Sequence, residues 1–160
     1  MSVASPSSVS PPASGAARRA WMAVFARTPR AALEAAFERA LEGTAAPAFD
    51  WLRPPEIGLA MVRGRIGGSG QQFNLGEVTV TRCSVQAGGH IGHAWVRGSN
   101  PQHAELAALA DAMLQDTQRH EQLQAQLLEP LARALEARRE ASSRKAAASK
   151  VEFFTVVRGE

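Results

Sequence analysis

With 160 residues, 45% of them hydrophobic, and a formal net charge of +3, the chain is long enough for one compact domain with its own core. Its single cysteine excludes an internal disulfide, and no apolar run approaches the ~20 residues that a membrane-spanning helix needs. The Ser- and Pro-rich start lacks the apolar centre of a signal peptide, so we expect a cytoplasmic protein.

The first part of the chain divides into a tail and two helices. Residues 1–15 are dominated by Ser, Pro and Ala without aromatic or charged side chains, which predicts a disordered tail before a single domain over residues 16–160. Helical spacing then places Trp21 and Phe25 on one face. Thr28 and Pro29 read as the N-cap and first residue of a second helix. We expect these two short helices to be antiparallel, as a helical hairpin.

The middle of the chain alternates between apolar and other residues, as strands do. A first strand is predicted over residues 57–65, with Pro54 and Pro55 marking its start, and β-branched residues predict a second over 73–85. Two consecutive glycines then form a two-residue hairpin turn before a third strand over 90–97. These strands make an antiparallel meander.

The last part of the chain combines helices with a final strand. Asn100 and Pro101 have the N-cap and first-position chemistry that opens a long helix, and Pro130 kinks or restarts it. Residues 138–150 are a linker or an exposed helix end. Residues 151–157 are apolar on both faces, so this predicted strand either joins the sheet or adds to a partner. The expected fold class is α+β: an N-terminal helical hairpin, an antiparallel β-meander, a long C-terminal helix pair and a final C-terminal strand.

Motifs for metal or phosphate binding are weak. His90 and His93 lie three apart on a strand and point to opposite faces, so they cannot share an ion, and Cys83 lies in no metal-binding pattern. We expect no metal site. The glycine-rich loop at 67–70 lacks both a following helix and a Gly-Lys-Ser/Thr ending. It forms a hairpin turn or a backbone nest for a phosphate oxygen, flanked by Arg63 and Arg65.

Three further side chains are candidates for ligand contact. His103 lies in the first turn of the long helix, where the helix dipole favours a neutral ring that could accept a hydrogen bond, although helix capping and N-terminal charge matching explain the residue without a function. Glu77 and Arg82 are charged side chains on an otherwise apolar strand, and strand alternation places them on opposite faces of the sheet. They form cross-strand pairs or lie at solvated sheet edges. The candidate ligand contacts are thus His103, Glu77, Arg82, Arg63 and Arg65, and no catalytic residue is assigned.

Several runs of sequence, in their order and spacing, resemble the PhnG family, a subunit family of the bacterial carbon–phosphorus lyase machinery for phosphonate use. They are WM (21–22), RGRIGGSG (63–70), FNLGEVTVTR (73–82), GHAWVRG (92–98), QHAE (102–105) and VEFFTVVRG (151–159). The resemblance implies a transferase complex with PhnI, PhnH, PhnJ and PhnL, with PhnK as a further candidate, in which this chain is a dimer within a hetero-oligomer.

The resemblance also implies the reaction. The complex transfers ribose triphosphate from MgATP to methylphosphonate and releases adenine, giving α-D-ribose 1-methylphosphonate 5-triphosphate, with the chemistry in PhnI and no cofactor bound by this subunit. We expect a role mainly in assembly and in shaping the site. Two alternatives stay open: a direct catalytic contribution through His103, Glu77 or Arg82, and a basic nucleic-acid-binding module. The dispersed arginines argue against the second, and no membrane partner is expected.

Overall fold

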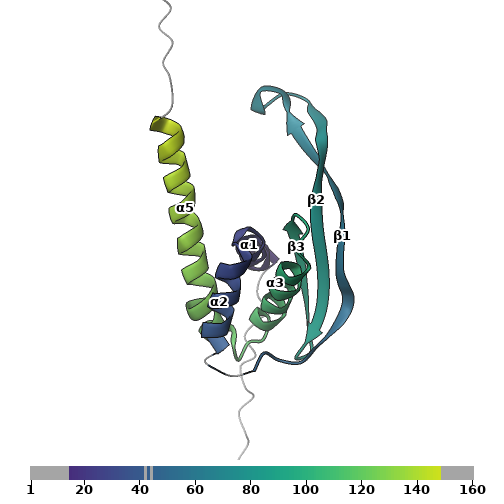
Figure 1. Cartoon of the computed structure of the whole chain (residues 1–160), viewed down its shortest axis with the longest axis vertical. Helices are drawn as coiled ribbons and strands as arrows, with labels where there is room; N and C mark the ends of the chain where they lie inside the picture. The colour runs from purple at the N-terminus through teal and green to yellow at the C-terminus, as the bar shows by residue number, and fades with distance from the viewer. Residues whose placement is uncertain (1–14, 42, 44, 149–160) are drawn as a thin grey trace, which may run out of the picture.

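A three-stranded antiparallel sheet and a set of helices make up the protein (Figure 1). The computed structural model describes residues 15–41, 43 and 45–148. The strands β1 (Phe49–Arg65), β2 (Gln72–Ala87) and β3 (His90–Arg97) are ordered β1-β2-β3, and helix α3 (Pro101–Leu114) packs on one face of this sheet. The predicted α+β class and β-meander are confirmed.

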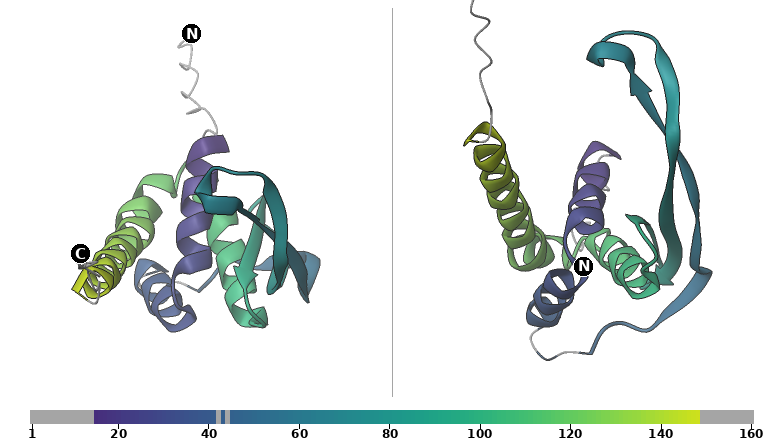
Figure 2. Two further views of the ribbon diagram at one scale, coloured as in Figure 1. Left: turned by 90° about the horizontal axis from the view of Figure 1, so that it is seen from above. Right: turned by 45° about the horizontal axis from the view of Figure 1, so that its top comes forward.

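The link between α1 (Gly15–Arg27) and α2 (Arg30–Leu41) differs from the expected hairpin. The Thr28 N–H and hydroxyl both donate to the Val24 carbonyl, at 2.9 and 2.8 Å, while the Pro29 carbonyl already accepts the N–H of Leu33 at 3.0 Å. Helical bonding therefore runs to Thr28 and resumes at Pro29, which leaves no residues to reverse the chain. Thr28 closes α1 instead of capping α2, and α2 lies beyond the end of α1 (Figure 2), so the antiparallel arrangement is wrong.

Strand β1 begins at Phe49, not at Ile57 as predicted. Its pairing with β2 shifts register between Trp51 and Arg53, just before the two prolines, and again between Arg53 and Glu56, across them. Proline is tolerated at bulges and on edge strands because no ladder hydrogen bond is required of its nitrogen there. The prolines therefore interrupt the ladder without ending the strand.

Beyond the sheet, β1 and β2 project as a two-stranded arm. Strand β3 pairs only with the later part of β2, from Val80 to Ala87. We call residues 57–65 and 72–79, with the turn between them, the distal ribbon. Its base, residues 57–58, pairs with residues 80–81 of β2, to which β3 also pairs, and the rest of it rises away from α3 (Figure 1). Its turn contains the short helix η1 (Ile66–Gly68), in which Gly67 and Gly68 have φ of 61° and 83°. The predicted hairpin turn at this glycine-rich loop is confirmed.

Helix α3 packs directly on the backbone of β3. A Cβ atom added to Gly92 would lie 1.9 Å from the Ala108 carbonyl oxygen and 2.7 Å from the Ala112 nitrogen, so only glycine fits. Apolar side chains of α1 and α2 close the core on the far side of α3, including Trp21, Phe25, Leu33 and Phe37.

The C-terminal helices break earlier than expected. Helix α3 ends at Leu114, and the chain resumes with α4 (His120–Leu123), the π-helical turn η2 (Gln124–Leu128) and α5 (Glu129–Ala148). Pro130 lies in the first turn of α5, where a missing N–H is tolerated, and the wide turn η2 precedes it. The disruption expected at Pro130 is thus a π-helical turn inside a continuous helical segment, and the break between helices lies before His120. The exposed helix end is confirmed over residues 138–148. Of the predicted tail at 1–15, residues 1–14 lie outside the described residues, and Gly15 already begins α1, so the helix starts one residue earlier than expected. The predicted final strand at 151–157 also lies outside the described residues.

Candidate functional site

The distal ribbon gathers three of the five predicted contact residues on one face. Opposed residues of an antiparallel pair share a face, and the register pairs Met61 with Glu77, Arg63 with Asn74 and Arg65 with Gln72. Strand alternation adds Ile57 and Leu59 to the same face. We call this the inner face of the ribbon, since Thr81, opposite Ile57, is buried beneath the helical layer.

The inner face has an apolar and a polar part. Ile57, Leu59 and Met61 are exposed by 55%, 65% and 51%, which is unusual for three neighbouring large apolar side chains on one strand face. Arg63 and Arg65 follow them toward the tip, and the Arg65 guanidinium donates to the Gly70 carbonyl at 3.2 Å. Such a surface suits a protein–protein contact with a charged end.

Arg82 lies on the opposite, outer face of the sheet. Its Nε and Nη2 donate to the same Glu56 oxygen, at 3.0 and 2.9 Å, which confirms cross-strand pairing for this residue. Its guanidinium carbon lies 5.7 Å from the centre of the Trp95 ring, and that indole is 55% exposed. An exposed tryptophan held by an arginine is typical of a binding hot spot. Arg82 is therefore separated by the sheet from Arg63, Arg65 and Glu77.

His103 is a buried structural residue. The Asn100 side chain accepts the His103 N–H at 3.1 Å, which confirms the predicted N-cap. The ring Nε2 lies 2.9 Å from the Phe25 carbonyl oxygen. A carbonyl only accepts, so Nε2 carries the proton, and the ring fastens α3 to the end of α1. His103 reaches neither the ribbon nor the Arg82 cluster.

Replacing His103 with alanine is expected to lower the free energy of unfolding by about 1–3 kcal/mol, because a buried carbonyl loses its donor. Chemical denaturation followed by circular dichroism measures this change. Unchanged stability together with lost activity of the assembled complex would instead assign His103 to the chemistry.

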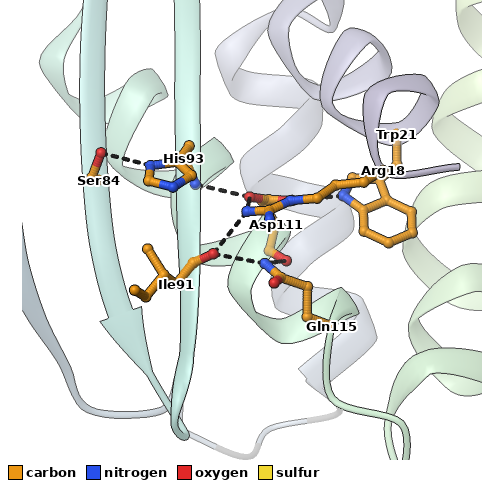
Figure 3. A network of polar contacts seen from close by, with 7 residues as sticks. All are labelled: Arg18, Trp21, Ser84, Ile91, His93, Asp111 and Gln115. Carbon is orange, nitrogen blue, oxygen red and sulfur yellow. Dashed lines mark hydrogen bonds and ion pairs between the residues drawn. The ribbon is translucent and has the colours of Figure 1, made fainter. Parts of the chain in front are cut away.

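A buried polar hub, absent from the sequence-based candidates, joins α1, β3 and α3 (Figure 3). The fully buried Asp111 carboxylate accepts from Arg18 Nε at 3.1 Å and Nη2 at 2.7 Å, from Trp21 Nε1 at 2.7 Å and from the His93 N–H at 2.8 Å. Gln115 extends the hub by donating to the Ile91 carbonyl at 2.8 Å. Each carboxylate oxygen thus accepts two donors, which makes Asp111 a structural anchor.

The placement of His93 fits a structural role, and the described residues offer no metal site. The His93 ring pairs through Nδ1 with the Ser84 hydroxyl at 2.8 Å. Among the described residues, no group of three or more His, Cys, Asp or Glu side chains is placed to hold a metal ion. The helices of the described part likewise include none with the length and apolarity required to cross a bilayer.

Cys83 is buried on the inner side of β2. Burial raises the pKa of its thiol from 9.0 to about 11, and the negative charge of Glu105 adds to the effect. The folded state therefore holds the thiol proton more tightly than the unfolded state, and this contribution to stability is lost as the pH rises from 9.0 toward about 11.

Because the thiolate is the reactive form, iodoacetamide at pH 8 is expected to modify folded Cys83 at least ~100-fold more slowly than the unfolded chain. Mass spectrometry of timed samples, with a denatured control, gives both rates. Equal rates would contradict the buried, protonated thiol.

An open groove of about 610 Å³ lies between α2, the start of β1 and α3. Its floor is apolar, from Phe37, Leu109 and neighbouring side chains. Among the residues that the structure describes, its polar rim has three carboxylates and a single arginine: Glu34, Glu38, Glu105 and Arg30. Arg30 is already paired with Glu34 at 3.1 Å, so the groove disfavours phosphate groups.

The comparisons with known proteins place these features in a family. Residues 16–159 match the family described as "Phosphonate metabolism protein PhnG". A protein of Rhizobium meliloti (strain 1021), named alpha-D-ribose 1-methylphosphonate 5-triphosphate synthase subunit PhnG, is 44% identical over 110 residues, which cover 68% of this chain and 70% of that protein. The resemblance drawn from the sequence motifs is confirmed.

Proposed function

The chain belongs to the PhnG family of phosphonate metabolism proteins, and from this membership we propose that it is a subunit of α-D-ribose 1-methylphosphonate 5-triphosphate synthase, within a phosphonate-utilising carbon–phosphorus lyase complex. This transferase moves ribose triphosphate from MgATP to methylphosphonate and releases adenine. The partners are PhnI, PhnH, PhnJ and PhnL, with PhnK as a further candidate, and the complex acts in the cytoplasm.

Within this complex the subunit has mainly an assembly role. The observation that supports this role is the exposed apolar surface of the distal ribbon. Ile57, Leu59 and Met61 expose apolar area on an arm that the rest of the described chain leaves uncovered. Covering a large apolar side chain stabilises by about 1.5–3 kcal/mol, so three neighbours supply a substantial part of the binding free energy. The outer-face pair of Arg82 and Trp95 provides a second contact. We assign the nucleosidase-type chemistry to PhnI.

The alternative is a direct catalytic contribution by His103, Glu77 or Arg82. The geometry does not favour it, because these three side chains lie in three places: the α1–α3 junction, the inner face of the ribbon and the outer face of the sheet. A shared reacting centre needs groups within hydrogen-bond reach of one substrate.

Reconstitution tests the proposal. PhnI, PhnH and PhnL are purified with and without this chain, and adenine release from MgATP is measured in the presence of methylphosphonate. We expect a stable assembly and adenine release only when the chain is present. Full activity without the chain, or a chain that never co-purifies with PhnI, would refute it.

A further inference from the structure

The tip of the ribbon has the chemistry of an anion contact. Four side chains of the inner face carry N–H donors: the guanidinium groups of Arg63 and Arg65, and the carboxamides of their cross-strand partners Asn74 and Gln72. Side chains on one face of a strand are about 7 Å apart, so the two arginines can approach one extended ligand. We call these four residues the tip face.

The positive charge of the tip face is not balanced by the other residues that the structure describes. In the described part of the chain neither Arg63 nor Arg65 forms an ion pair, whereas Arg53 and Arg82 both pair with Glu56. Glu77, opposite Met61, is the carboxylate that the register places beside the tip face. One carboxylate against two guanidinium groups leaves a net positive charge at the end of the ribbon.

Binding of a partner subunit would make this excess of positive charge unfavourable in free energy. The apolar part of the inner face lies directly next to the tip face, so a partner that covers Leu59 and Met61 also removes water from around Arg63. A charge taken out of water must be paired to avoid a large penalty. Guanidinium groups pair best with carboxylates and phosphates, which match their forked donors.

We propose that the tip face binds the phosphate groups of the nucleoside triphosphate substrate at the interface with the partner subunit. This inference rests on the proposed function, which supplies a polyphosphate ligand. The acidic groove between α2 and α3 is unsuited to that ligand, whereas the tip face offers donors from four side chains. Arg63 and Arg65 then bind the substrate, and the groups that make and break bonds belong to the partner.

The test uses the assembled complex with the double variant R63A/R65A. The control is R39A/R97A, which removes the same charge from an exposed helix and strand position. We expect R63A/R65A to assemble normally, with the KM and the Kd for ATP raised 10- to 100-fold and kcat changed less. Inorganic tripolyphosphate should compete with ATP for the wild-type complex. In the R63A/R65A complex this competition should be much weaker. R63K/R65K should restore part of the affinity.

Three results would overturn the inference. Unchanged ATP and tripolyphosphate binding in an active, intact complex would refute the tip-face site while leaving the proposed function standing. A complex that dissociates on R63A/R65A would show that partner carboxylates pair with the arginines. An equal loss in R39A/R97A would reduce the effect to general electrostatic attraction.

Discussion

Replacing Asp111 with alanine is expected to lower the free energy of unfolding by about 3–5 kcal/mol, because it removes the buried partner of a half-buried ion pair and the acceptor of two further N–H groups. The change leaves the Arg18 guanidinium without its carboxylate, and it leaves the Trp21 indole N–H and the His93 N–H without acceptors (Figure 3). Chemical denaturation followed by circular dichroism gives the change.

Two variants make this result interpretable. Asp111→Asn keeps the shape but turns one acceptor into a donor facing other donors, so we expect a loss smaller than that of alanine but above about 1 kcal/mol. Glu140→Ala breaks only the exposed pair with Arg144, at 3.8 Å, and should cost less than about 0.5 kcal/mol. A loss for Asp111→Ala no larger than that for Glu140→Ala would contradict the hub as an anchor.

The second large effect is expected at the ribbon. Replacing Leu59 with aspartate should weaken binding to PhnI at least ~100-fold, since it removes apolar contact area and places an unpaired charge in a covered surface. The same variant should keep its free energy of unfolding within about 0.5 kcal/mol, because Leu59 is 65% exposed in the chain alone. A binding titration and a denaturation curve separate the two outcomes.

Ala137→Asp is the matched control for Leu59→Asp. It introduces the same charge at an exposed position of α5, away from the ribbon. Binding to PhnI should then stay within about threefold of the wild type. Equal weakening by both substitutions would assign the effect to net charge, and unchanged binding by Leu59→Asp would remove the ribbon from the interface.

The sequence predicts those parts of the fold that depend on neighbouring residues. The Asn100 cap, the glycine turns and the alternation of β2 and β3 follow from local backbone chemistry, and the structure has all of them. Alternation also placed Glu77 and Arg82 on opposite faces correctly. The start of β1 could not be found in this way, because Pro54 and Pro55 are tolerated only through bulges against β2.

The buried hub shows why many of the polar contacts could not be predicted from the sequence. Arg18 and Asp111 are 93 residues apart, and no local pattern links them. One signal was present in the sequence: an aspartate inside the apolar run of α3, where an unpaired carboxylate would be costly. The shared face of Arg63, Arg65 and Glu77 likewise depends on the strand register, which shifts between Val62 and Arg63.

Amide hydrogen exchange shows whether a partner subunit covers the distal ribbon. Exchange of residues 57–65 and 72–79 is measured in the free chain and in the reconstituted complex with PhnI. Amides of the ribbon should exchange fast in the free chain and at least tenfold more slowly in the complex, with those of α3 changed little. Equal exchange of the ribbon in both states, in a complex shown to be intact, would contradict coverage of the ribbon by a partner.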